Sequence, residues 1–160
     1  MTQPLSPEAF VARYGELFEH SRWVVERAAR NLSAGGDLHA GLMRVVYDAS
    51  GDEQLALIRA HPELAGKAAI DHTLTAASAL EQASAGLDRL TGEEFARFQA
   101  LNAAYRQRFG FPFIICVRLT DKAGILAAMQ RRLGHSREEE ISAALDEIGH
   151  ITRLRLKDLA

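Results

Sequence analysis

Residues 50–67 read SGDEQLALIRAHPELAGK and combine a helix start, an apolar helical run and an abrupt stop. Ser50 predicts a helix N-terminus, because a serine side chain can cap free backbone amides. The apolar run Leu55–Ile58 continues this helix. Pro62 pushes the residue before it out of the α-helical region, so the helix should end at or near His61. The sequence therefore predicts a helix that ends in a stiff turn at His61.

The histidine at this helix end has two interpretations. Its charge changes near neutral pH, so an imidazole fixed there is suited to proton transfer. It could instead only cap its helix by bonding the last carbonyl groups. Gly66 permits a second change of direction after the turn. The stretch alone leaves both interpretations of His61 open.

The same start and stop signals recur along the chain. Predicted helix starts are Ser6, Ser21, Asp37, Ser50 and Asp121, and capping boxes are predicted at Thr91 with Glu94 and at Ser136 with Glu139. The Ala34-Gly35-Gly36 stretch should break one helix, a short helix is predicted over 76–85, and the last one should reach about Leu156. We therefore predict an all-α fold, a single globular domain over residues 1–160 with about eight helices.

The segment Phe113–Val117 is the exception to the helical pattern. Its composition is strand-like, but no second strand is predicted to pair with it. We expect a buried extended connector or the beginning of a helix. If it is extended, its backbone N–H and C=O groups need partners. Either the core or a planar, amide-rich ligand could supply them.

The composition narrows the classes of function. The 160 residues include 48% hydrophobic and 25% charged residues with a net charge of −2, as in an ordinary globular protein. Without a basic excess, neither nucleic acid nor an anionic membrane is an expected partner. The single Cys116 excludes an internal disulfide, and its apolar surroundings indicate a buried thiol rather than a nucleophile.

We identify no signal in the sequence that would direct the protein out of the cytoplasm. No apolar run reaches the roughly 18 residues of a membrane span. No secretory signal is visible at Met1–Pro4, and Lys157–Ala160 is not a peroxisomal targeting signal.

The six histidines contain no pair at metal-binding helical spacing, and no phosphate loop or nucleophile elbow occurs. We expect a cytoplasmic protein with no metal and no cofactor, whose chemistry is proton transfer.

Arg155 lies in an unusual place on the last predicted helix. Ile148 and Ile151 belong to its apolar stripe, and Arg155 falls within about 20° of that stripe. Arg153 should point to solvent. A core-facing arginine needs a partner, which could be an internal salt bridge or the carboxylate or carbonyl of a substrate.

Ser78, Glu81 and Gln82 share one face of the predicted 76–85 helix. Three polar side chains there could bind a flat polar ligand, with Glu81 acting as a base or an orienting group. The alternative is a capping box that starts the helix at Ser78 and turns Glu81 back onto the backbone.

Together these motifs resemble the OHCU decarboxylase family, where OHCU is 2-oxo-4-hydroxy-4-carboxy-5-ureidoimidazoline, an intermediate of urate breakdown. The resemblance covers nearly the whole chain, in the expected order. The motifs are Phe18-Glu19-His20-Ser21-Arg22-Trp23, His61-Pro62-Glu63-Leu64-Ala65-Gly66-Lys67, Ser78-x-x-Glu81-Gln82-x-x-Ala85-Gly86-Leu87, Phe109-Gly110-Phe111-Pro112-Phe113-Ile114 and Arg153-Leu154-Arg155-Leu156. The 34–36 stretch lacks a proline that the family pattern leads us to expect.

The resemblance implies an all-α, cofactor-free homodimer that converts OHCU to S-allantoin and CO2. It makes His61 the catalytic histidine, which we expect to be the proton donor. We expect Glu81 to be a second catalytic group that orients the substrate and His61. It implies substrate contacts from Pro62, Ser78, Glu81, Gln82 and Arg155 and from the backbone of Phe113 and Ile114. Two alternatives stay open: a non-catalytic helical binding module that kept the pocket, and a lyase of the same family acting on a related ureido acid.

Overall fold

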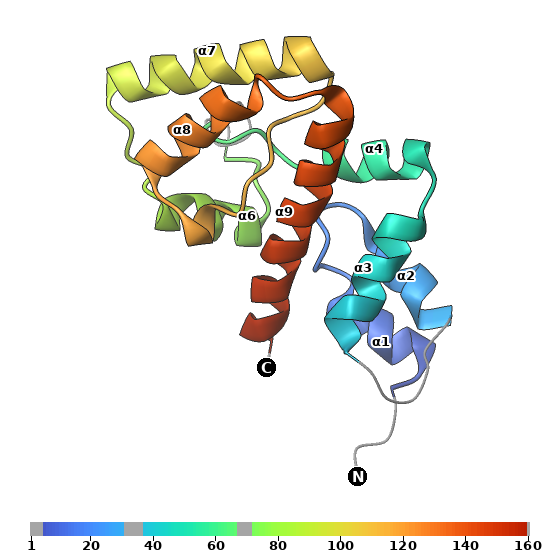
Figure 1. Ribbon diagram of the computed structural model, residues 1–160. Coiled ribbons are helices and arrows are strands. Elements are labelled where there is room, and N and C mark those ends of the chain that lie inside the picture. The colour runs from blue at the N-terminus through green and yellow to red at the C-terminus, as the bar shows by residue number, and fades with distance from the viewer. Residues whose placement is uncertain (1–4, 31–36, 67–71, 160) are drawn as a thin grey trace.

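The computed structural model describes residues 5–30, 37–66 and 72–159, and within these ranges it contains eight α-helices, one 3-10 helix and no β-strand (Figure 1). The helices are α1 (Pro7–Tyr14), α2 (Arg22–Arg30), α3 (Leu38–Asp48), α4 (Gly51–Arg59), α6 (Ala76–Ser84), α7 (Gly92–Phe109), α8 (Lys122–Arg132) and α9 (Arg137–Asp158). The 3-10 helix η1 spans Val117–Leu119. The predicted all-α class is confirmed.

Most helix starts follow the predicted capping chemistry. Full capping boxes form at Ser50, Thr91 and Ser136, each with a glutamate three residues later. The side chains of Ser6 and Asp37 also accept hydrogen bonds from first-turn amides. These starts depend only on neighbouring residues, which is why a sequence pattern finds them. The predicted break at residues 34–36 lies outside the described residues.

Helix α9 runs through the middle of the molecule and organises the rest (Figure 1). Helices α7 and α8 lie on one side of it, and α1, α2 and α3 lie on the other. It contacts α3 and α4 directly. Ile148 and Leu145 on its inner face are buried in the core, whereas Arg153 is exposed as predicted. Near its C-terminal end the same inner face carries Arg155, which is 7% exposed.

A buried polar network beside α9 fixes the connector between α7 and η1. Glu140 is fully buried and accepts hydrogen bonds from Tyr105 at 2.5 Å and Arg132 at 2.8 Å. Arg132 also donates to the carbonyl of Ile114 at 2.8 Å. Because each charged group has a partner, the burial is tolerated. The sequence left open a connector or the beginning of a helix over Phe113–Val117: residues 113–116 form the connector, and Val117 begins η1.

One alternative raised by the sequence is wrong. Helix α6 begins at Ala76, and its N-cap is Thr75, whose side chain accepts a hydrogen bond from the amide of Ser78. Ser78 therefore lies within the first turn and cannot be the cap. Its hydroxyl and the Glu81 carboxylate are free to point away from the helix backbone.

Within the described ranges, no helix combines the length and apolar character needed to cross a membrane.

Candidate active site

The turn after α4 holds His61 in one orientation and one protonation state. Its Nδ1 lies 2.9 Å from the carbonyl oxygen of Leu57. Because a carbonyl oxygen only accepts, Nδ1 must carry a proton. Burial lowers the pKa of His61 to about 4, although the Leu57 carbonyl and the charge of Glu19 oppose the shift. At neutral pH the imidazole is therefore neutral, with its proton on Nδ1.

This tautomer leaves Nε2 as an unprotonated nitrogen with a lone pair. Nε2 is buried and has no hydrogen-bond partner in the described part of the chain. Buried polar atoms are nearly always paired, so an orphan at a candidate site indicates a function. Both sequence interpretations of His61 are thus compatible: one nitrogen caps α4, and the other remains available for chemistry.

Amide side chains from two other helices brace the turn that follows His61. Gln82 of α6 accepts a hydrogen bond from the amide of Ala65 at 3.0 Å. From α7, Asn102 donates to the Leu64 carbonyl at 2.8 Å, and Gln99 donates to the Ala65 carbonyl at 3.0 Å. Ala65 adopts a left-handed conformation with a φ of 52°. Such strain persists only where the surroundings enforce it, so these amides lock the turn and His61 with it.

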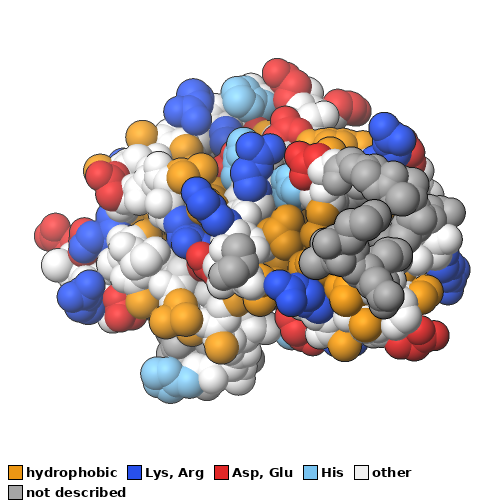
Figure 2. All heavy atoms as spheres, turned by 90° about the horizontal axis from the view of Figure 1, so that it is seen from below, with side chains coloured by type: hydrophobic (Ala, Val, Ile, Leu, Met, Phe, Trp, Pro, Cys, Tyr) orange, Lys and Arg blue, Asp and Glu red, His pale blue; other side chains and the backbone are white. Residues whose placement is uncertain are grey.

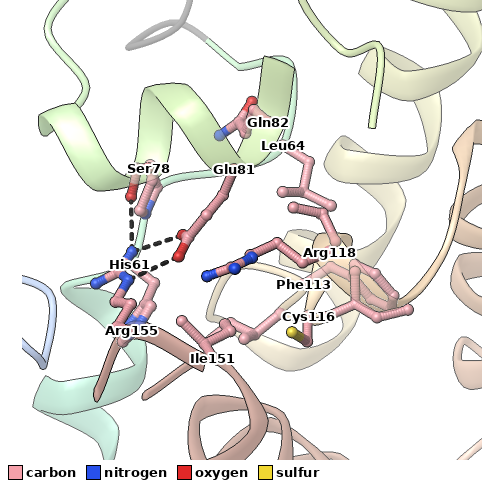
Figure 3. A pocket seen from close by; sticks show the side chains of 14 residues that line it. His61, Leu64, Ser78, Glu81, Gln82, Phe113, Cys116, Arg118, Ile151 and Arg155 are labelled. Atoms are coloured by element: carbon pink, nitrogen blue, oxygen red, sulfur yellow. Dashed lines mark hydrogen bonds and ion pairs between the residues drawn. The ribbon is translucent and has the colours of Figure 1, made fainter. Parts of the chain in front are cut away.

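Arg155 is the centre of an ion-pair network. Its Nε and Nη2 donate to the two carboxylate oxygens of Glu81 at 2.8 and 2.7 Å (Figure 3). Its Nη1 donates to Glu19 and to the Leu17 carbonyl, both at 3.2 Å, and Nη2 also reaches the Ser78 hydroxyl at 3.3 Å. Guanidinium has five N–H groups, and these five contacts engage all of them. The salt-bridge interpretation of Arg155 is confirmed.

Glu19 is a member of this network that reasoning on individual residues did not single out. It is 3% exposed and accepts hydrogen bonds from Ser78 at 2.7 Å and from Thr75 at 2.9 and 3.0 Å. Burial raises its pKa, but the bond from Ser78 and the charge of Arg155 outweigh burial and lower the pKa overall. Glu19 is therefore an anion. It lies in a loop without periodicity, and its motif resemblance was the only signal in the sequence.

All of the sequence-predicted site residues line one cavity. They are His61, Pro62, Ser78, Glu81, Gln82, Phe113, Ile114 and Arg155. The cavity has a volume of about 40 Å³, and its remaining lining includes Cys116, Arg118 and Ile151. Figure 3 shows that α6 supplies Glu81 from one side and that α9 supplies Arg155 and Ile151 from another. Positions far apart in the chain thus converge on one site.

The connector that lines this cavity has backbone N–H groups without partners in the described part of the chain. The N–H groups of Phe113, Ile114 and Ile115 donate no hydrogen bond to any described residue. The next amide, that of Cys116, donates to Glu147 at 2.9 Å. Unpaired N–H groups in a cavity wall can bind the carbonyl oxygens of a planar ligand. Burial raises the pKa of the Cys116 thiol, so that side chain acts as apolar wall.

The cavity lining therefore combines an imidazole lone pair, an oriented carboxylate and a backbone segment with unpaired amides. This set suits proton transfer and electrostatic stabilisation on a small polar ring. Within the described residues, no group of three or more His, Cys, Asp or Glu side chains could hold a metal ion.

Comparison with known proteins gives a consistent family. The family model described as OHCU decarboxylase matches residues 3–157. The chain is 45% identical over 156 residues to 2-oxo-4-hydroxy-4-carboxy-5-ureidoimidazoline decarboxylase from Haloferax volcanii, covering 96% of this chain and 90% of that protein. The enzyme of the same name from Halalkalicoccus jeotgali is 42% identical over 154 residues, covering 95% and 85%. A crystal structure of (S)-allantoin synthase aligns with a TM-score of 0.72 and 30% identity over 98% of this chain and 51% of that one.

Proposed function

We propose that this chain, which belongs to the OHCU decarboxylase family, decarboxylates OHCU to S-allantoin and CO2 in urate breakdown. Two relatives named as decarboxylases of this compound match the chain over 90% and 85% of their own length. The observation that carries the proposal is the orphaned Nε2 of His61 in a cavity that also holds the Glu81–Arg155 pair. No cofactor is needed for the steps derived below.

The chemistry depends on where the electrons of the broken bond go. The carboxylate of OHCU is attached to a carbon beside a C=N bond, so those electrons can pass into the C=N group as CO2 leaves. One C–C bond breaks, and one proton is taken up because an anionic substrate becomes a neutral product. The protein must hold the carboxylate out of the ring plane, stabilise the charge that enters the ring, and deliver a proton to one face.

His61 is the proton carrier in this proposal. Its neutral, Nδ1-protonated form cannot donate from Nε2 until that nitrogen has collected a proton. We infer that Nε2 first accepts the proton of the 4-hydroxyl group, whose oxygen becomes a ring carbonyl, and then delivers that proton to one face of the carbon of the former C=N bond. The nitrogen that received the electrons of the broken bond takes up the one further proton from solvent. Transfer by one fixed group explains why a single enantiomer would form. Such proton transfer contributes roughly 10²–10⁴-fold to a rate.

Glu81 and Arg155 orient the substrate. Both carboxylate oxygens of Glu81 are held by Arg155, so Glu81 has one fixed direction, with further lone pairs available to the N–H groups of the ring or ureido substituent. The free amides of Phe113 and Ile114 complement it by donating to ring carbonyls. Because Arg155 has no unengaged N–H, its contribution to binding is its charge and its hold on Glu81.

The direct test adds the protein to freshly generated OHCU and measures release of CO2 above the spontaneous rate. The proposal predicts acceleration by the wild type and near-complete loss of it in His61→Asn, with the fold retained by circular dichroism. A wild-type rate equal to the buffer rate would contradict it. That outcome would favour the non-catalytic binding module, which would still bind allantoin, and turnover of another ureido acid alone would favour the related lyase.

The assembly and location implied by the family resemblance belong to the same proposal: a homodimer in the cytoplasm. Exposed apolar side chains at Leu80, Phe95 and Leu119 support an interface. Light scattering at micromolar concentration should give twice the monomer mass of 17.6 kDa, and a monomeric mass would contradict the dimer.

A further inference from the structure

Arg118 occupies the boundary between the cavity and a larger groove beside it. The groove has a volume of about 530 Å³, and three residues line both spaces: Glu81, Arg118 and Arg155. Arg118 belongs to η1, directly after the connector that lines the cavity. In Figure 3 its guanidinium projects among the cavity residues toward Glu81. Basic side chains also gather near the middle of the face where α9 ends (Figure 2).

The charges in the cavity leave Arg118 as its available cation. Arg155 pairs with Glu81, which lines the cavity, and with Glu19, which is not part of the lining, and these two negative charges exceed its single positive charge. His61 is neutral, and every N–H of Arg155 is already engaged. Of the described residues that line the cavity, Arg118 is the remaining positive side chain. An anion that loses water on entering a largely apolar site needs a compensating charge.

The present partner of Arg118 is easily exchanged. Its two terminal nitrogens donate to Asp158 at 2.7 and 3.3 Å, and no other described residue accepts from its guanidinium. The two side chains are 30% and 59% exposed. An ion pair this open to water contributes little to stability. A substrate carboxylate can therefore replace the Asp158 carboxylate at small cost.

We propose that Arg118 binds the carboxylate of the substrate at the mouth of the cavity and so selects the anionic substrate over the neutral product; this inference rests on the decarboxylase function proposed above. The cavity of about 40 Å³ holds only a few water molecules, so a ring-sized substrate must displace lining side chains. The long, half-exposed Arg118 is the one that can move with the ligand. Once CO2 has left, the charge that Arg118 recognised is gone, which favours product release.

The test compares steady-state kinetics of the wild type and Arg118→Gln with freshly generated OHCU. Loss of one charged contact made before the chemical step should raise KM about tenfold while kcat stays within about twofold. Added salt should raise the KM of the wild type and have less effect on the variant, because the lost attraction is electrostatic. Arg118→Lys keeps the charge without the planar fork and should give an intermediate KM.

Two further variants serve as controls. Arg89→Gln removes an equal charge from a side chain that is 79% exposed and absent from the cavity lining, and its KM should equal that of the wild type. Asp158→Asn removes the competing carboxylate and should lower KM. Calorimetry should show that Arg118→Gln binds neutral allantoin as tightly as the wild type does.

The outcomes separate this inference from the proposed function. Two results with an active wild type would contradict the inference that Arg118 binds the carboxylate. One is an unchanged KM in Arg118→Gln, and the other is a loss of affinity for allantoin as large as the loss for OHCU. If the wild type does not accelerate decarboxylation at all, the proposed function fails and the inference fails with it. A raised KM with unchanged allantoin affinity supports both.

Discussion

The buried, neutral state of His61 predicts a specific dependence of stability on pH. Its pKa is 6.5 in an unfolded chain and about 4 in the folded protein, because burial disfavours the charged form. At 1.36 kcal/mol for each pH unit, this difference corresponds to about 3 kcal/mol. The unfolded chain takes up this proton as the pH falls through 6.5, whereas the folded protein resists it until about pH 4. The contribution is therefore complete above pH 6.5 and is lost as the pH falls toward 4.

The measurement is urea unfolding of the wild type and His61→Asn at several pH values between 4 and 7. Other titrating groups are shared, so the difference between the two free energies of unfolding isolates His61. Between pH 7 and pH 4, the free energy of unfolding of the wild type should fall by about 3 kcal/mol more than that of His61→Asn. In the same range, kcat of the wild type should hold down to about pH 5. A difference that does not change with pH would refute the neutral, buried imidazole.

Three substitutions test the network behind the cavity. Arg155→Lys cannot hold both oxygens of Glu81, so kcat/KM should fall about tenfold or more; unchanged kinetics would limit Arg155 to a structural ion pair. Glu81→Gln keeps the shape but loses the charge and should lower kcat by roughly 10²-fold, and full activity would restrict Glu81 to holding Arg155. Glu19→Gln leaves the Arg155 charge partly unpaired and should lower the free energy of unfolding by about 3 kcal/mol, measured with urea; a change below about 1 kcal/mol would count against its role as a buried partner.

Local chemistry explains how much of the fold the sequence could predict. Helix starts such as those at Ser50 and Ser136 need only a capping side chain and a glutamate within one turn. The apolar stripe of α9 also predicted that Arg155 faces the core, because the angle between successive residues of an α-helix is fixed. The start of α6 was ambiguous because Thr75 and Ser78 are both good caps, and only the coordinates assign the cap to Thr75.

The site was less predictable, because its properties arise from contacts between distant segments. The sequence found the residues that line the cavity, partly through family resemblance, but not how they are paired. The engagement of all five N–H groups of Arg155 depends on α6 and on the loop around Glu19. The tautomer of His61 depends on the exact end of α4. Arg118 belongs to no sequence pattern that marks it as a site residue, and its importance follows from its place where the cavity and the groove meet.

The most direct measurement is the enantiomeric excess of the allantoin that forms from fresh OHCU, followed by circular dichroism with wild type, with His61→Asn and without protein. If one imidazole held in a fixed orientation sets the face that receives the proton, only the wild type should yield a single enantiomer. Racemic product from the wild type, or a single enantiomer from the variant, would contradict that role for His61.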